Sequence, residues 1–211
     1  MAVERSTRTA RREETRRLLL EAAGTLFAER GYHATSVPDI VRAAGVGHGT
    51  FYEYFGSRHQ ILLALTESAA SGSRRPRLQS DSLPERIRAE ISWYFGDVVE
   101  HLQLTKVWRE AATFDPEIAA AGRAERARRV ERVRRGIEAA GPAPGIDPAI
   151  AAAALTAMLE AFADRWFVEG DGPGTSAADI VTASETLATM WLATLGLEPP
   201  AQPVRSSTPP R

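Results

Sequence analysis

The stretch TSVPDIVRAAGVGHGTFYEYF, residues 35–55, combines two short helical patterns with a glycine between them. In the first pattern apolar residues recur three and four positions apart, which places them on one face of a helix of about two turns. Gly45 then permits a sharp turn, and an apolar pair four residues apart follows it. The apolar positions are Val37, Ile40, Val41, Ala44, Phe51 and Phe55. The stretch therefore predicts a helix-turn-helix whose inner face is core.

The outer face of the second short helix carries groups that can form hydrogen bonds. Tyr52 and Tyr54 can pack their rings while their hydroxyls reach a phosphate, and His48 lies one turn before Tyr52 on the same face. Gly47 and Gly49 have no side chains, so the backbone amides in the first turn of this helix can approach DNA closely. The alternative interpretation of this spacing is a helical hairpin that binds no DNA and whose tyrosines are simply exposed to solvent.

The N-terminal segment is rich in arginine. Residues 1–17 carry six arginines and three glutamates. We expect residues 1–12 to form a basic flexible arm, which is typical of phosphate-binding proteins. A solvated tail without a partner would have the same composition.

The remainder of the chain predicts an all-α protein, because apolar residues keep a helical spacing and alternating strand patterns are missing. Asp115-Pro116 and Asp147-Pro148 each predict a helix start, with the aspartate as cap and the proline in the first turn. The segment between Ser82 and Asp115 is too long for one ordinary helix, so we expect a break near residues 101–104.

These patterns predict four segments. They are the arm 1–12, a helix-turn-helix domain at 13–73, a larger helical domain at 75–197 and a disordered tail at 198–211, which is rich in proline. The helix that begins at Arg58 is expected to link the two domains. Residues 123–140 are expected to form a solvated amphipathic helix and not a second DNA surface.

Composition argues against several classes of protein. The chain has 211 residues and a net charge of −1. It has no cysteine, which is typical of proteins in a reducing cytoplasm and excludes a cysteine nucleophile or a thiolate metal site. No apolar run is long enough for a membrane span. Four histidines show no metal-ligand spacing, and no nucleophile or phosphate-loop motif occurs. We therefore expect a cytoplasmic protein that is not an enzyme and needs neither a metal nor a cofactor.

Residues 18–65 resemble the DNA-binding domain of the TetR family of transcriptional regulators. The pieces AAGTLFAERGYHATSV, DIVRAAGV and GTFYEYFGSR carry this resemblance. Carried over residue by residue, it implies DNA contacts at Ser36, Val37, Pro38, Gly47, His48, Gly49, Thr50, Tyr52, Tyr54 and Arg58. Thr50, Tyr52, Tyr54 and Arg58 would position the phosphates, and His48 would read a base.

Three positions depart from the family pattern. The family often has Ser or Ala at the position of Gly47, and Lys or Arg at that of His48. Pro38 stands where some members have a polar base reader. These departures predict fewer direct base contacts and more reliance on His48 and on the N-terminal arm. Glu53 is expected to be solvated or paired within the protein, with acceptance from a cytosine amine as the alternative.

The resemblance implies a ligand-binding and dimerisation role for residues 75–197. Bulky apolar residues that could line a cavity are Trp93, Leu104, Val107, Trp108, Ala111, Phe114, Met158 and Phe162, with plain core as the alternative for each. A dimer interface on the last two helices would use Leu155, Trp166, Met190 and Trp191. The prediction is a homodimeric, ligand-responsive repressor that binds a palindromic DNA operator and is released by a small apolar or amphipathic effector. The alternative is a constitutive DNA-binding protein or an activator without a ligand.

Overall fold

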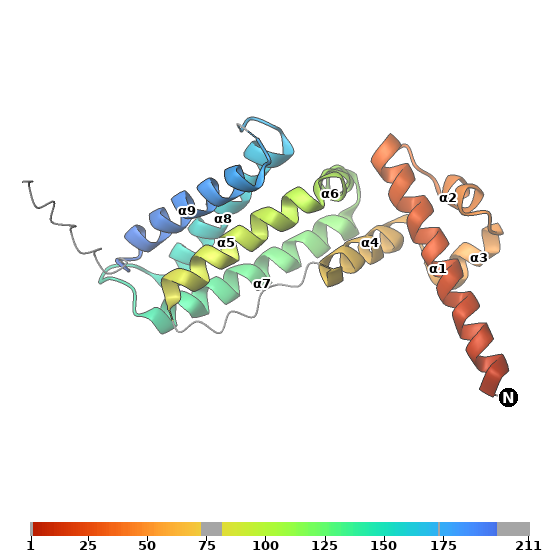
Figure 1. Ribbon diagram of the computed structural model, residues 1–211, viewed down its shortest axis with the longest axis horizontal. Coiled ribbons are helices and arrows are strands. Elements are labelled where there is room, and N and C mark those ends of the chain that lie inside the picture. Colours follow the sequence, from red (N-terminus) through yellow and green to blue (C-terminus); the bar gives the residue numbers. More distant parts are fainter. Residues whose placement is uncertain (1, 73–81, 173, 198–211) are drawn as a thin grey trace, which may run out of the picture.

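The computed structural model describes residues 2–72, 82–172 and 174–197. Over these residues the chain forms nine α-helices and one π-helical turn, which confirms the predicted all-α class. The elements are α1 (Ala2–Arg30), α2 (Val37–Ala44), α3 (His48–Tyr54), α4 (Arg58–Gly72), α5 (Leu83–Glu100), α6 (Leu102–Phe114), α7 (Pro116–Ala140), α8 (Pro148–Ala163), η1 (Asp164–Val168) and α9 (Ala177–Thr194). Helices α1–α3 lie at one end of an elongated molecule, and α5, α7, α8 and α9 form a bundle at the other (Figure 1).

The N-terminal segment differs from the predicted flexible arm, because α1 already begins at Ala2. Residues 2–23 contain neither proline nor glycine, so nothing in this part of the chain breaks a helix. Arg17 also hydrogen-bonds Glu14 and Glu21, three and four residues away along the helix. The predicted arm is therefore part of a helix, which ends at Arg30 and is followed by Gly31 with φ of 80°.

The predicted helix-turn-helix is confirmed. Ser36 caps α2 in a capping box with Asp39, and Gly45 takes the left-handed conformation, with φ of 67°, that the turn requires. Phe51 and Phe55 are buried as expected, since they face the core beneath α3. Local chemistry thus accounts for both ends of α2.

The helix boundaries in the larger domain also follow the sequence signals. Helix α5 ends at Glu100 and α6 begins at Leu102, which confirms the predicted break. The carboxylates of Asp115 and Asp147 each accept hydrogen bonds from two backbone amides at the starts of α7 and α8. The tail predicted at 198–211 lies outside the described residues.

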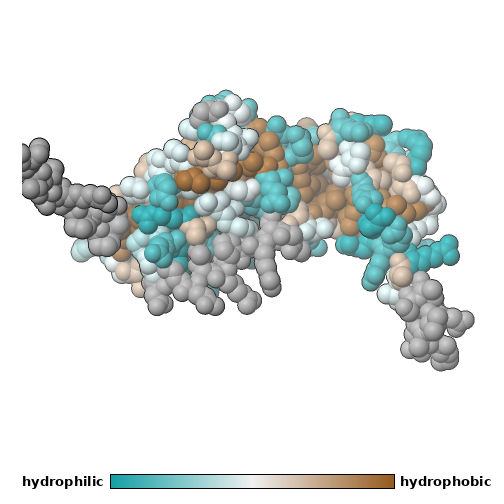
Figure 2. Space-filling view, viewed as in Figure 1, coloured by the Kyte–Doolittle hydropathy of each residue, from teal (hydrophilic) through white to brown (hydrophobic). Residues whose placement is uncertain are grey.

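The two hydrophobic clusters do not follow the predicted domain boundary. Val107 and Ala111 of α6 and Ile118 at the start of α7 are buried together with the core of α1–α4. Figure 2 shows hydrophobic atoms continuing between the two ends of the molecule where α6 meets α1. The expected link through α4 is therefore joined by a second one, in which α6 and the start of α7 pack against α1–α4.

The second cluster lies inside the bundle of α5, α7, α8 and α9. Its middle is aromatic: the ring of Phe95 lies 5.5 Å from that of Phe162 and 5.2 Å from that of Phe167, measured between centroids. These rings fill the bundle near η1. The space that remains open in the bundle lies closer to its far end, between α5 and α7.

Candidate functional site

The predicted DNA-contacting residues form one surface around α2 and α3. Tyr52 is 53% exposed, and its ring centroid lies 5.4 Å from that of His48, so the two side chains present a joint face. The exposed members of the predicted set are Ser36, Pro38, Gly47, His48, Gly49 and Tyr52, and the half-buried members are Val37, Thr50, Tyr54 and Arg58. A short helix with an open polar face is the geometry needed to enter a major groove.

Helix α1 brings positive charge to this surface. The guanidinium of Arg12 lies 5.9 Å from the ring centroid of Tyr54, and that of Arg16 lies 5.6 Å from the ring centroid of Phe55. Both arginines are exposed. The α1 helix therefore places cations beside the end of α3, where phosphates of a bound duplex would lie.

Arg58 faces inward, which differs from the predicted phosphate contact. One of its terminal nitrogens donates to the carbonyls of Tyr32 (3.0 Å), His33 (3.2 Å) and Thr35 (2.8 Å). Its guanidinium also lies 4.1 Å from the ring centroid of Tyr32. Through these contacts Arg58 stabilises the turn between α1 and α2. The backbone carbonyls of that turn accept no hydrogen bond within a helix, so they need another donor.

The same turn is held from the larger domain by Glu110 of α6. Its carboxylate accepts hydrogen bonds from the amides of Tyr32 (3.0 Å) and His33 (2.8 Å). The Tyr32 hydroxyl in turn donates to Asp115, the cap of α7, at 2.8 Å. We call Tyr32, Arg58, Glu110 and Asp115 the junction, because they connect the turn after α1 to α4, α6 and α7.

Burial and the junction contacts shift two pKa values. Burial raises the pKa of Tyr32 to about 12, and the hydrogen bond to Asp115 adds to this effect. Burial alone would raise the pKa of Asp115, but hydrogen bonds from Tyr32 and from the amides of Ile118 and Glu117 outweigh it and hold that pKa below its usual range. At neutral pH the junction therefore pairs a neutral phenol with a carboxylate.

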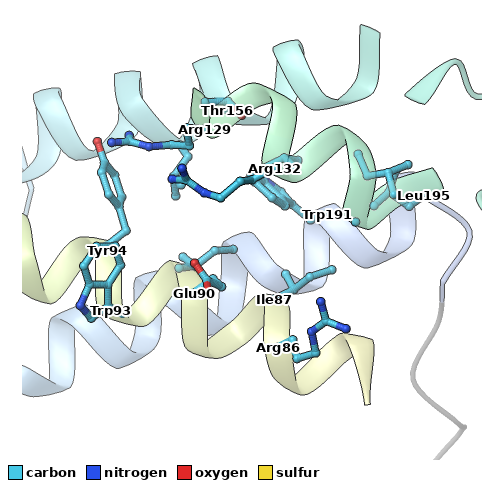
Figure 3. A pocket seen from close by; sticks show the side chains of 15 residues that line it. Arg86, Ile87, Glu90, Trp93, Tyr94, Arg129, Arg132, Thr156, Trp191 and Leu195 are labelled. Carbon is cyan, nitrogen blue, oxygen red and sulfur yellow. The ribbon is translucent and has the colours of Figure 1, made fainter. Parts of the chain in front are cut away.

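A cavity of about 320 Å³ lies in the larger domain between α5, α7, α8 and α9 (Figure 3). Its residues are Arg86, Ile87, Glu90, Ile91, Trp93, Tyr94, Arg129, Arg132, Val133, Gly136, Ile137, Thr156, Leu159, Trp191 and Leu195. The volume is at the small end of the range typical of ligand pockets. Apolar walls with a few polar groups are the usual composition of such a site.

The cavity corrects most of the predicted ligand-binding residues. Of that set only Trp93 lines it. Leu104, Val107, Trp108 and Ala111 pack in or against the N-terminal core, while Phe114 is exposed and contacts the ring of His33. The apolar stripe of α6 is covered by α1 and not by a cavity, because α6 lies across the end of the bundle. Met158 and Phe162 line a second pocket of about 340 Å³, in the groove between α8 and α9, so both do lie on a cavity wall.

The predicted dimer residues divide into two pairs. Leu155 and Trp191 are buried inside the bundle and expose little of their side chains to a partner. Met190 is 49% exposed, and Trp166 stacks on Phe162 with ring centroids 4.6 Å apart; both line the groove between α8 and α9. The exposed positions along these two helices are mostly small or apolar: Ile150, Ala153, Ala154, Ala157, Ala161, Val181, Thr182, Thr186, Thr189, Met190 and Ala193.

Most residues that line the cavity, and all contacts of the junction, were not predicted from the sequence. Thr156 was a sequence signal for a polar group in the core, because its side chain carries a hydroxyl within the otherwise apolar run AIAAAALTAM. Arg129 and Arg132 could not be told from their neighbours in the sequence, since they lie in a helix with many arginines. Both line the cavity, but Arg132 is exposed, as expected for a solvated helix, while Arg129 is half-buried. Tyr32 and Glu110 meet across 78 positions of sequence. No spacing rule reveals such a contact.

Two kinds of feature are missing from the described residues. Within 2–72, 82–172 and 174–197, no three His, Asp or Glu side chains gather as metal ligands would. In the same part of the chain no helix is both long and apolar enough to span a membrane.

Comparison with known proteins points to one family. Residues 19–65 match the model for bacterial regulatory proteins of the tetR family. The chain is 34% identical over 94 residues to the HTH-type transcriptional activator FasR of Mycolicibacterium smegmatis, covering 43% of this chain and 42% of the relative. It is 36% identical over 86 residues to the HTH-type transcriptional repressor Rv3405c of Mycobacterium tuberculosis, covering 41% and 45%. The chain thus spans less than half the length of these curated relatives.

Solved structures match over more of the chain. The crystal structure of a putative TetR-family transcriptional regulator from Syntrophomonas wolfei superposes with a TM-score of 0.70 at 23% identity, covering 88% of this chain and 99% of that one. The TetR-family regulator PfmR of Thermus thermophilus gives a TM-score of 0.59 at 28% identity, covering 84% and 98%. These likenesses show a fold in which a helix-turn-helix is joined to a larger helical domain. The resemblance to the TetR family in sequence is carried by residues 19–65, the helix-turn-helix part of the chain.

Proposed function

We propose that the protein is a transcriptional repressor that binds a palindromic DNA operator as a homodimer and is released by a small molecule. The observation that carries the proposal is the exposed face of His48 and Tyr52 on α3, within a domain that matches the family model. Tyr52, Tyr54 and Thr50 would position phosphates, and His48 would read a base edge. Arg12 and Arg16 would add phosphate contacts from α1.

A homodimer is proposed because a seven-residue recognition helix alone offers little surface for specific binding. The α8–α9 face supports this, since the exposed residues of these helices other than Glu185 are small or apolar and the face carries a groove at Met158, Phe162 and Met190. Two such faces would form a four-helix bundle. The half-sites would then lie roughly 34–36 Å apart or slightly more.

Response to a ligand is proposed because the larger domain contains the cavity between α5 and α7, whereas a constitutive protein would need none. The junction offers a route for coupling. Helix α7 lines the cavity and begins at Asp115, which holds Tyr32. A ligand that displaces α7 would move this contact and tilt α1–α3 against the larger domain. The relatives include both an activator and a repressor by name, so the sign of regulation needs its own test.

The proposal is tested by selecting operators from random duplex DNA with the full chain, followed by fluorescence anisotropy on the selected site. We expect a palindrome, binding as a dimer, and loss of binding for a single half-site. A reporter gene behind this operator distinguishes repression from activation. Equal affinity for random duplex and selected site would refute specific regulation.

A further inference from the structure

The recognition helix α3 carries one acidic residue, Glu53, which is not among the DNA contacts that the family resemblance implies. We infer that its carboxylate accepts a hydrogen bond from the N4 amine of a cytosine in the major groove and thereby specifies one base pair in each half-site. This inference rests on the proposed operator binding, and it adds a base reader to the same surface.

Glu53 lies on the side of α3 that points away from the core. Phe51 is fully buried, and Glu53 follows it by two positions, which is about 200° around the helix axis. Gly49 precedes Phe51 by two positions, so it lies on the same outer side, one turn before Glu53. Because glycine has no side chain, Glu53 carries the only side chain that points directly away from the core.

The outer side of α3 is open. A Cβ added at Gly49 would have free space around it, and Glu53 is exposed. Figure 1 shows α3 at the end of the molecule that lies away from the bundle of α5, α7, α8 and α9. The helix has seven residues and is therefore about 10 Å long, whereas the major groove is about 12 Å wide. Both turns of α3, including the one with Glu53, can therefore lie inside the groove.

Glu53 has no partner within the described part of the protein. It forms no hydrogen bond or ion pair with any residue that the structure describes, so the internal pair that the sequence allowed is not formed there. The arginines Arg12 and Arg16 of α1 contact the rings of Tyr54 and Phe55 instead. Glu53 also lies in the last turn of α3, where a negative charge opposes the helix dipole. Its charge therefore does not stabilise the free protein, and its acceptor oxygens are available to DNA.

The chemistry of the groove decides which base suits this carboxylate. DNA phosphates repel a negative charge, so a carboxylate in the groove needs a hydrogen-bond donor opposite it. Guanine presents only the acceptors N7 and O6 there, and thymine presents the acceptor O4. Cytosine presents its N4 amine, whereas adenine places its N6 amine beside the acceptor N7. Glu53 should therefore attract cytosine and repel guanine and thymine, and both effects contribute to specificity.

The first test selects duplex sites from random DNA with the full chain and with Glu53→Ala. We expect one position in each wild-type half-site at which cytosine is preferred about tenfold. Glu53→Ala should lose this preference and keep the rest of the motif, with unchanged thermal stability because Glu53 is exposed. Glu53→Gln should shift the preference towards adenine, since an amide can both donate to N7 and accept from N6.

A modified operator isolates the single hydrogen bond. In N4-methylcytosine a methyl group replaces the amine hydrogen that faces the major groove, while the other hydrogen still pairs with guanine. With this base at the selected position of both half-sites, wild-type affinity should fall at least about tenfold in fluorescence anisotropy, and that of Glu53→Ala should not change. Equal weakening of both proteins would show that the methyl group acts sterically and would overturn the inference.

Two control variants separate the reading of a base from the effect of charge. Glu53→Asp keeps the charge but shortens the side chain by one methylene group, so it should lose the cytosine preference without changing affinity for random duplex. Glu13→Gln removes a negative charge from an exposed position of α1 and should leave the motif unchanged. A loss of the cytosine preference in Glu13→Gln would make the effect one of overall charge and would contradict the role of Glu53.

The wild-type selection separates this inference from the proposed function. If the wild type selects a motif and Glu53→Ala selects the same one, operator binding stands and the assignment of Glu53 is wrong. If the wild type selects no motif, both are wrong. A folded Glu53→Ala variant that loses every position of the motif would identify Glu53 as a general contact, which also overturns its assignment to one base pair.

Discussion

Tyr32, at the end of α1, donates a hydrogen bond of 2.8 Å to Asp115, the residue that caps α7. The contact joins the DNA-binding domain to the helix that lines the cavity. Tyr32 is 1% exposed, so water cannot replace its partner.

Tyr32→Phe should therefore lower the free energy of unfolding by about 1 kcal/mol, because it removes one buried hydrogen bond and keeps the ring. Urea unfolding of the full chain measures this. Tyr52→Phe is the matched control, since Tyr52 is exposed and its hydroxyl should not affect stability. Equal stability of wild type and Tyr32→Phe would show that the contact is not stabilising.

The lowered pKa of Asp115 predicts how stability depends on acidity. A carboxyl whose pKa is lower in the folded than in the unfolded state stabilises the fold above the unfolded value, about 3.9. That contribution is lost as pH falls through the folded pKa. The wild type should thus lose stability more steeply below about pH 4 than Asp115→Asn, which keeps the cap. In a Tyr32→Phe background the difference should shrink, and parallel acid profiles in all variants would contradict the assignment.

Arg58→Gln should reduce stability and leave the salt dependence of DNA binding unchanged. The physical reason is that its guanidinium is committed to the carbonyls of the α1–α2 turn. A lost phosphate contact would instead reduce the slope of log affinity against log salt by about 0.9. Arg12→Gln provides the comparison, because Arg12 lies exposed beside Tyr54 and should reduce that slope.

Tyr52 and His48 should affect DNA binding in different ways although their rings are in contact. Tyr52→Phe should weaken binding to all duplexes alike, by about 1 kcal/mol, since a phosphate contact carries no sequence information. His48→Ala should instead relax the preference at one base pair, by about 1–3 kcal/mol. Binding-site selection with each variant checks this, and an unchanged motif for His48→Ala would rule it out as base reader.

Met190→Glu should convert the proposed dimer to a monomer, because it would place two carboxylates in the apolar α8–α9 interface. Sedimentation velocity at micromolar concentration measures the change. Phe114→Glu is the control, since Phe114 is a comparably exposed apolar residue at the other end of the larger domain. A dimer that survives Met190→Glu would move the interface away from this face.

Local chemistry was readable from the sequence. Gly45 adopts the positive φ that its place after an apolar pattern predicts, and Asp115 and Asp147 cap the helices that they were expected to begin. Phe51 and Phe55 are core because their spacing puts them on one helical face. Each of these features depends on residues within a few positions of one another, so the sequence contains all the information that decides them.

Only the tertiary structure decided what covers each helical face. Val107 and Trp108 have the apolar spacing expected of a cavity wall, yet α1–α4 cover them. Trp191 has the character of an interface residue, yet it points into the bundle and leaves its N–H unpaired by any residue described. Periodicity shows that a face is buried but not against which element, because that depends on how helices distant in sequence pack. The cavity and the junction both arise from such packing, which is why the contacts of Tyr32 with Glu110 and Asp115 appear only in three dimensions.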